Sequence, residues 1–166
     1  MLIYPYELDK NDGYPSRSSF TVKKQDGEMG YGVYTKKDIK RGSLVARFSG
    51  NVINKVVQHS LQINPTTHLY DPHFSGLLLH SCSPNVMLDM QDFTIWAITD
   101  IEAGEALTMD YASTEDHLFK QFKCLCESEN CRHWISGRRE SVNAEGEEYL
   151  KDFIKENKVL RIKKTG

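Results

Sequence analysis

Long hydrophobic runs and an excess of basic residues are both missing from this sequence of 166 residues. No apolar stretch approaches the ~20 residues that a helix needs to cross a bilayer, so we expect no membrane association. The chain contains 21 lysine and arginine residues against 23 aspartate and glutamate residues, which gives a formal net charge of −2. A slightly negative chain has no general attraction to nucleic acid, so we also expect no direct nucleic-acid binding.

The N-terminal segment lacks the pattern of a secretory signal. Residues 1–7, Met-Leu-Ile-Tyr-Pro-Tyr-Glu, contain no basic segment followed by an apolar core. We therefore expect an intracellular location, where a reducing environment makes disulfides rare. The length suits one domain better than two independent hydrophobic cores.

Cysteine is scarce, with four residues, and three of them are crowded together. Cys124, Cys126 and Cys131 lie within eight positions, whereas Cys82 stands alone. Clustered thiols in a reducing compartment are typical of metal or redox sites. A disulfide between Cys124 and Cys126 would close an unfavourably small ring. Structural zinc takes four ligands, so the three clustered thiols leave one position to fill.

Two residues compete for that fourth position. His133 follows Cys131 by two residues, so its backbone would have to double back, whereas Cys82 would complete a site that uses every thiol in the chain. The alternative for Cys82 is a small, buried, apolar side chain. We predict one Zn2+ held by Cys82, Cys124, Cys126 and Cys131. Such a site would tie the C-terminal segment to a much earlier loop, and metal binding would contribute to its folding.

Short strand-like segments fill the first two-thirds of the sequence. Apolar or β-branched residues bounded by turn residues predict strands at Phe20–Lys24, Tyr31–Thr35, Leu44–Phe48, Val52–Val57, Val86–Met90, Phe93–Thr99 and Leu107–Met109. Residues 58–76 contain Asn-Pro and Asp-Pro turn signals and are predicted to be irregular. Apolar residues at helical spacing predict a late helix over Glu147–Lys158. The whole pattern favours a mainly β fold.

Acidic residues are concentrated in a stretch that contains no lysine or arginine. They are Asp100, Glu102, Glu105, Asp110, Glu115 and Asp116. One interpretation is a solvated loop and strand edge. The other is a surface that attracts a basic partner.

Five short motifs, in order, resemble those of the SET-domain protein-lysine methyltransferases. They are Gly30-Tyr31-Gly32-Val33-Tyr34, similar to that family's G-x-G-V-[FY]; Phe48-Ser49-Gly50, in the place of Y-x-G; His80-Ser81-Cys82-Ser83-Pro84-Asn85, similar to the core of N-H-S-C-x-P-N; Gly104-Glu105-Ala106-Leu107-Thr108-Met109-Asp110-Tyr111, similar to G-E-E-L-T-F-D-Y; and Cys124–Cys131, similar to the post-SET cysteine cluster. Each motif alone is weak evidence, but five in the family's order, over roughly residues 20–137, are specific.

The resemblance implies a SET fold of small curved β-sheets with a pseudoknot, a zinc-bound post-SET segment and a C-terminal helix. It divides the chain into an N-terminal extension (1–19), a SET domain (20–112), a post-SET zinc-binding segment (113–137) and a C-terminal helical tail (138–166). In that family the post-SET cysteines bind zinc together with the cysteine of the H-S-C motif. This agrees with the assignment of Cys82.

The implied reaction transfers a methyl group from S-adenosylmethionine to the ε-amine of a protein lysine. Tyr111 is the implied catalytic residue, because the last tyrosine of that motif directs its hydroxyl at the transferring methyl group and the incoming nitrogen. The alternative is a buried tyrosine that ends a strand. The implied cofactor contacts are Met29, Gly30, Tyr31, Gly32, Leu79, His80, Phe122 and Trp134. The candidates for the wall of the lysine channel are Phe48, Tyr70, Phe74, Met109 and Phe119.

Two of these side chains have a structural alternative. His80 is either a cofactor contact or a structural histidine whose hydrogen bonds are satisfied within the fold. Trp134 either stacks on adenine, once zinc has folded the tail, or belongs to the core.

Three positions depart from the family's pattern. Leu79 replaces an asparagine that helps to hold the amino-acid end of the cofactor. Phe48 replaces a tyrosine whose hydroxyl lies near the substrate amine. Met109 occupies a position where phenylalanine or tyrosine influences how many methyl groups are added, so the degree of methylation stays open.

The leading hypothesis is a zinc-stabilised enzyme that methylates a basic protein such as a histone tail, in the nucleus if the host is a eukaryote. A second hypothesis keeps the chemistry with a non-histone protein as substrate. A third is an inactive SET fold that binds a partner, and the retained Tyr111 argues against it. The oligomeric state stays open.

Overall fold

The computed structural model describes residues 1–25 and 30–165, with side chains up to residue 158. Short strands account for most of the regular structure, and the predicted mainly β fold is confirmed. The strands are β1 (Phe20–Lys24), β2 (Tyr31–Thr35), β3 (Leu44–Arg47), β4 (Asn51–Ile53), β5 (Ser60–Asn64), β6 (Thr67–Tyr70), β7 (Leu79–His80), β8 (Val86–Asp89), β9 (Thr94–Ala97), β10 (Thr108–Met109), β11 (Phe122–Lys123) and β12 (Trp134–Ile135). Two 3-10 helices, η1 (Ser75–Leu77) and η2 (Tyr111–Ser113), and one α-helix, α1 (Ala144–Thr165), complete the described elements.

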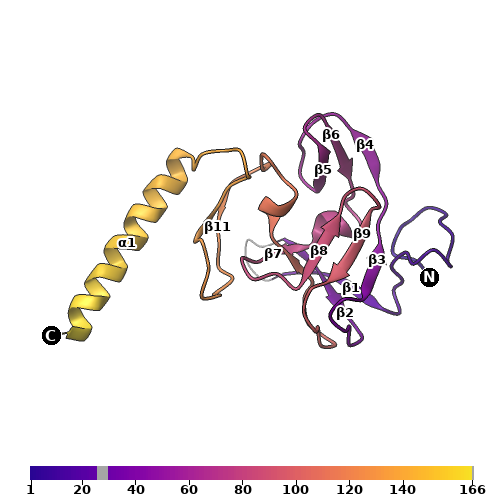
Figure 1. Cartoon of the computed structure of the whole chain (residues 1–166), viewed down its shortest axis with the longest axis horizontal. Helices are drawn as coiled ribbons and strands as arrows, with labels where there is room; N and C mark the ends of the chain where they lie inside the picture. The colour runs from indigo at the N-terminus through magenta and orange to yellow at the C-terminus, as the bar shows by residue number, and fades with distance from the viewer. Residues whose placement is uncertain (26–29, 166) are drawn as a thin grey trace.

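The strands form five small sheets (Figure 1). Four of them are antiparallel, with the strand orders β1-β2, β3-β9-β8, β4-β6-β5 and β11-β12. The fifth pairs β7 with β10 in parallel, Leu79 opposite Thr108 and His80 opposite Met109. This non-local pairing brings residue 111 beside residues 78–80.

One hydrophobic core fills the space between these sheets. Its most deeply buried members come from strands and from the loops between them and include Val33, Phe48, Phe74, Ile95 and Leu107, each at most 1% exposed. A smaller cluster around Cys82, Cys124 and Ile135 lies under the C-terminal segment.

The prediction of an irregular segment over residues 58–76 is wrong for residues 60–70. Residues 60–64 and 67–70 form the β5–β6 hairpin, and the Asn-Pro pair belongs to its turn. The buried polar side chains of Gln62 and His68 interrupt the hydrophobic alternation that identifies a strand in a sequence.

Helix α1 runs away from the sheets, at the side of the molecule opposite the N-terminus (Figure 1). It is longer at both ends than the predicted Glu147–Lys158. Two ring contacts in its first half hold it: Tyr149 packs on Trp134 with ring centroids 5.7 Å apart, and Phe153 stacks on His133 at 3.9 Å. Among the described residues no helix has the length and hydrophobicity of a membrane span.

Candidate active site and metal centre

Four thiols from two distant segments meet at one point. The Sγ atoms of Cys82, Cys124, Cys126 and Cys131 all lie within 4.8 Å of one another, and those of Cys82 and Cys124 are 3.9 Å apart. A tetrahedral zinc ion with Zn–S bonds of about 2.3 Å would hold its sulfurs about 3.8 Å apart. The cysteines selected from the sequence therefore form a donor set whose number, chemistry and spacing fit one zinc ion.

Backbone N–H groups of the tail point at two of these sulfurs. The N–H of Arg132 donates to Cys82 Sγ at 3.4 Å, and the N–H of His133 donates to Cys131 Sγ at 3.4 Å. Such hydrogen bonds stabilise the thiolate, which is the form that binds metal, and fix its direction.

The two ends of the Cys-x-Cys pair differ in acidity. Burial raises the pKa of the Cys124 thiol. Burial has the same tendency at Cys126, but hydrogen bonds from Ser128, whose Oγ lies 3.0 Å from the sulfur, outweigh it and lower the pKa of Cys126 to about 5. Of these two thiols, Cys126 therefore offers a thiolate more readily.

His80 connects the cysteine cluster to Tyr111. Its Nε2 lies 3.5 Å from Cys82 Sγ, and its Nδ1 accepts a hydrogen bond of 3.2 Å from the N–H of Tyr111. Burial lowers the pKa of His80, Asp110 opposes this change and Arg132 adds to it, and together they bring the pKa to about 4. The ring is therefore neutral at pH 7, and its accepting Nδ1 places the proton on Nε2, facing the sulfur.

Tyr111 begins η2, and its phenol has a fixed direction. The hydroxyl donates to the carbonyl oxygen of Leu78 at 2.6 Å, and the ring packs edge-on against His80 and Phe122 with centroids 5.2 and 5.7 Å away. Burial raises the pKa of Tyr111 to about 12. The phenol is thus neutral and pre-oriented in the physiological pH range.

A cavity of about 640 Å³ opens beside this tyrosine. Residues from the first motif, from the fourth motif and from the segment before the cysteine cluster lie on its wall. They include Gly30, Tyr31, Met109, Tyr111, Phe119 and Phe122. The first motif therefore meets residues from some eighty positions later in the sequence at one cavity, and each of these residues had been predicted as a site residue.

Several other predicted site residues are not among the described residues that line this cavity. Phe48 and Phe74 are fully buried in the hydrophobic core, and Tyr70 lies on β6. Leu79 packs on Gly32, where an added Cβ would lie 3.1 Å from the Leu79 Cδ1. The roles assigned to these residues and to Gly32, five in all, stay predictions.

Two further predicted cofactor contacts are Trp134 and Met29. Trp134 is 6% exposed, its indole N–H donates to Gln121 Oε1 at 2.9 Å, and the start of α1 covers its ring at Gly146. This environment is that of a core residue, so its contact with adenine stays a prediction. Met29 lies outside the described residues.

Many residues on the cavity wall are not among the site residues predicted from the sequence, and two of them, Leu78 and Glu115, bear on the site. Leu78 contributes a backbone carbonyl, which leaves no signal in side-chain identity. Glu115 is 6% exposed, and its Oε2 accepts the N–H of Gln62 at 2.8 Å. Its place in an acidic stretch had suggested a solvated side chain, whereas burial raises its pKa.

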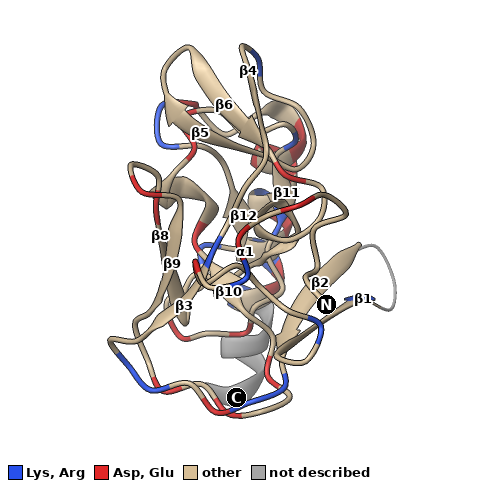
Figure 2. Cartoon of the chain, turned by 90° about the vertical axis from the view of Figure 1, so that its right-hand side faces the viewer, with Lys and Arg blue, Asp and Glu red and all other residues tan. Residues whose placement is uncertain are grey.

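Two carboxylates of the acidic stretch between residues 100 and 116 already form ion pairs with arginines of the tail. Asp110 forms an ion pair with Arg132 at 2.7 Å, and Asp116 forms one with Arg138 at 3.0 Å. Figure 2 shows acidic and basic residues intermixed along the chain. The tail thus supplies the counter-charges that the stretch itself lacks.

Comparison with known proteins places this geometry in context. The family model of the SET domain matches residues 30–112. The variant-silencing SET domain-containing protein of Plasmodium falciparum (isolate 3D7) is 31% identical over 179 residues, a match that covers 88% of this chain and 7% of that protein. Histone-lysine N-methyltransferase ash1 of Drosophila melanogaster is 28% identical over 139 residues, covering 69% of this chain and 6% of that protein. The chain thus spans under a tenth of the length of either relative.

Solved structures share the fold. The crystal structure of KRYPTONITE in complex with mCHG DNA and SAH superimposes with a TM-score of 0.57 and 25% sequence identity, covering 69% of this chain and 29% of that one. The methyltransferase domain of human histone-lysine N-methyltransferase SETMAR superimposes with a TM-score of 0.55 at 21% identity, covering 71% of this chain and 58% of that one.

Proposed function

Because the chain belongs to the SET-domain family, we propose that it is a protein-lysine N-methyltransferase that uses S-adenosylmethionine. One observation carries this proposal: the segments of the first and fourth motifs and the residues before the cysteine cluster line one cavity, with the neutral phenol of Tyr111 on its wall. The names of the relatives, several of which are histone-lysine N-methyltransferases, support the same activity.

S-adenosylmethionine would supply an electrophilic methyl group on a cationic sulfur. Tyr111 would present an uncharged oxygen to the reacting atoms, stabilising the polarised methyl group without a full negative charge that would hold the cation in place. The Leu78 carbonyl and the rings of His80 and Phe122 keep that oxygen in position before substrate arrives. Such preorganisation lowers the barrier because no dipole has to reorient during the reaction.

The target lysine must lose its proton, although the pKa of a free lysine is ~10.4. The wall contributed by Met109, Phe119 and Phe122 is apolar, and desolvation against it disfavours the ammonium form. Tyr111 itself brings no charge to counter this effect. The cavity would therefore deliver a neutral amine to the reaction.

Backbone groups of the first motif would hold much of the cofactor. Gly30 adopts φ = +68°, a conformation that favours glycine, and lies on the cavity wall. The adenosyl end would lie near His80 and Phe122. The bound SAH of the KRYPTONITE structure, at 25% identity, supports cofactor use in this fold.

Zinc would act as a structural ion. Its four cysteine ligands leave no open coordination position, and they join the tail to Cys82, which lies two residues after His80 of β7. The metal would keep the residues that follow Tyr111 folded against the cavity.

A histone tail is the substrate that we propose first, with a nuclear location in a eukaryotic host. Support comes from the names of the relatives. The engaged carboxylates of Asp110 and Asp116 weaken the argument from general acidic attraction, so selection would depend on the cavity and its rim.

The test is incubation of the zinc-loaded protein with S-adenosylmethionine labelled in the methyl group and with mixed histones. Labelled histones, with no label from Tyr111→Phe, would support the proposal, and mass spectrometry would identify the lysine. Label on other proteins only would favour the non-histone alternative. Cofactor binding without any transfer would favour an inactive, partner-binding fold, which is supported by the departures at Leu79 and Phe48.

A further inference from the structure

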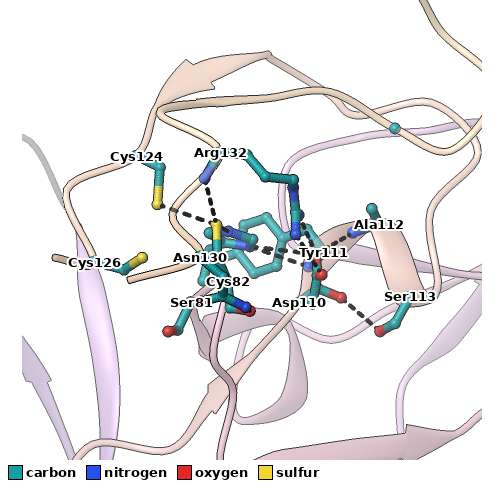
Figure 3. Close-up of polar contacts among 12 residues, drawn as sticks. Ser81, Cys82, Asp110, Tyr111, Ala112, Ser113, Cys124, Cys126, Asn130 and Arg132 are labelled. Carbon is teal, nitrogen blue, oxygen red and sulfur yellow. Dashed lines mark hydrogen bonds and ion pairs between the residues drawn. The ribbon is translucent and has the colours of Figure 1, made fainter. Parts of the chain in front are cut away.

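An ion pair joins the cysteine-rich tail to the residue before Tyr111. Arg132 donates to both carboxylate oxygens of Asp110, from Nη1 to Oδ2 at 2.9 Å and from Nη2 to Oδ1 at 2.7 Å. Figure 3 shows the guanidinium of Arg132 reaching from the cluster to this carboxylate. Two parallel charge-assisted hydrogen bonds of this kind fix orientation as well as distance.

Both partners are anchored at their other ends. The backbone N–H of Arg132 donates to Cys82 Sγ, and the neighbouring Asn130 donates from Nδ2 to the Cys82 carbonyl at 3.0 Å. Asp110 caps η2, because its Oδ1 accepts the N–H of Ala112 at 3.0 Å. One side chain therefore connects the cysteine cluster to the turn that begins with Tyr111.

We propose that Arg132 is a positioning residue, through which the folded, metal-bound tail holds Tyr111 in its productive orientation by way of Asp110. The proposal rests on the proposed function and on the zinc assignment. Its logic is a chain of short contacts: the thiol cluster fixes the Arg132 backbone, the guanidinium fixes the Asp110 carboxylate, and the carboxylate fixes the first turn of η2.

Because this ion pair is partly exposed, its effect on the rate can be distinguished from its effect on the stability of the fold. The Arg132 and Asp110 side chains are 42% and 24% exposed, and ion pairs at such sites contribute little to the stability of a fold. A small misplacement of a catalytic group can nevertheless reduce a rate by up to about 100-fold. Loss of the pair should therefore lower kcat much more than it lowers the melting temperature.

The matched comparison is Arg132→Gln against Arg139→Gln. Arg139 is also an exposed tail arginine near a carboxylate, with Nε 3.8 Å from Asp116 Oδ1, but it does not contact the residue before Tyr111. Arg132→Gln should lower kcat about 10- to 100-fold, with zinc content and cofactor Kd unchanged and only a small drop in melting temperature. Asp110→Asn should have a similar effect, the double variant should be no worse than either single one, and Arg132→Lys should recover part of the rate. A drop no larger than that of Arg139→Gln would overturn the proposal.

A second measurement does not depend on activity. Hydrogen exchange of the Ala112 and Ser113 amides is followed in the full chain before and after zinc is removed with a chelator. In the wild type, removal of zinc should speed this exchange; in Arg132→Gln, exchange should already be fast and chelation should add little. Equal acceleration in both proteins would overturn the coupling. Absence of all methyl transfer, with the expected exchange pattern, would instead contradict the proposed function alone.

Discussion

The Tyr111 hydroxyl donates to the carbonyl oxygen of Leu78 at 2.6 Å, across the junction between η2 and the strand β7. The contact connects two segments that parallel pairing of β7 with β10 has already brought together. This hydrogen bond fixes the orientation of the Tyr111 hydroxyl, because its proton points at the Leu78 carbonyl oxygen. The lone pairs of the phenol oxygen therefore point away from Leu78. Burial keeps this phenol neutral by raising its pKa to about 12.

Removal of that hydroxyl tests its role directly. Tyr111→Phe should lower kcat by at least about 100-fold, the loss typical when one preorganised dipole is removed from an active site. Cofactor binding should persist, since the ring keeps its contacts with His80 and Phe122. Single-turnover transfer and calorimetric binding of the cofactor measure the two quantities. An unchanged rate would remove Tyr111 from the mechanism.

Loss of one thiol should release the metal. Cys82→Ser removes the ligand that links the tail to the earlier loop, so zinc content should fall from one ion per chain to well below one, and the tail after residue 123 should become sensitive to proteases. Elemental analysis and limited proteolysis measure these effects. The control is Ser83→Ala, an exposed neighbour whose side chain lies outside the thiol cluster. Retention of one zinc ion per chain would mean that another residue is the fourth ligand.

Much of this site could be predicted from the sequence, because residue type carried the signal. The count of four thiols predicts that Cys82 joins the distant cluster, and the order of the short motifs predicts that Gly30 and Tyr111 belong to one site. In the structure the four thiols meet, and Gly30 and Tyr111 lie on the wall of one cavity. The sequence patterns of β1 and β2 predict strands with the bounds that the structure has.

The remaining features depend on contacts that no local pattern encodes. The β5–β6 hairpin buries Gln62, whose side chain donates to Asp116 at 2.7 Å, so a polar residue stands where the pattern of a strand calls for an apolar one. The pairing of Arg132 with Asp110 spans 22 residues. Trp134 was assigned a second interpretation as a core residue, and only the course of α1 shows what covers it.

The contact of α1 with Trp134 leads to an unusual prediction for Gly146, a glycine of this helix. Alanine at a helix position is normally more stable than glycine, by about 1 kcal/mol. At Gly146, however, an added Cβ would overlap the indole ring of Trp134, which is held by its hydrogen bond to Gln121. We therefore expect Gly146→Ala to destabilise the tail by about 1–3 kcal/mol. Thermal unfolding and the emission wavelength of tryptophan would detect it.

The control for that substitution is Glu148→Ala, at an exposed position of the same helix. It should leave the melting temperature almost unchanged. If Gly146→Ala raised the melting temperature instead, helix propensity would dominate, and the close contact between α1 and Trp134 would not exist in solution.

Two adjacent carboxyl groups should respond to pH in opposite ways. Burial raises the pKa of Glu115, whereas hydrogen bonds from Gln62 and Arg138 outweigh desolvation and lower the pKa of Asp116. Because the pKa of Glu115 is higher in the folded protein than in the unfolded chain, the folded protein binds the proton of this carboxyl more tightly. The protonated carboxyl therefore contributes stability in acid, and this contribution is lost as the pH rises from the unfolded pKa of ~4.3 through the folded pKa. Glu115→Gln should therefore be more stable than the wild type at pH 7, and the gain should vanish below about pH 4.

Asp116→Asn is the matched control and has the opposite sign. A lowered folded-state pKa contributes stability above the unfolded value of ~3.9, and this stability disappears as pH falls through the folded value. Asp116→Asn should therefore be less stable than the wild type at pH 7, and the deficit should shrink in acid. Urea unfolding of the three proteins between pH 3 and pH 7 measures both differences. For each variant, the difference in unfolding free energy from the wild type is plotted against pH. The burial of Glu115 and the ion pair of Asp116 with Arg138 predict slopes of opposite sign for the two variants. Slopes of the same sign would contradict this assignment.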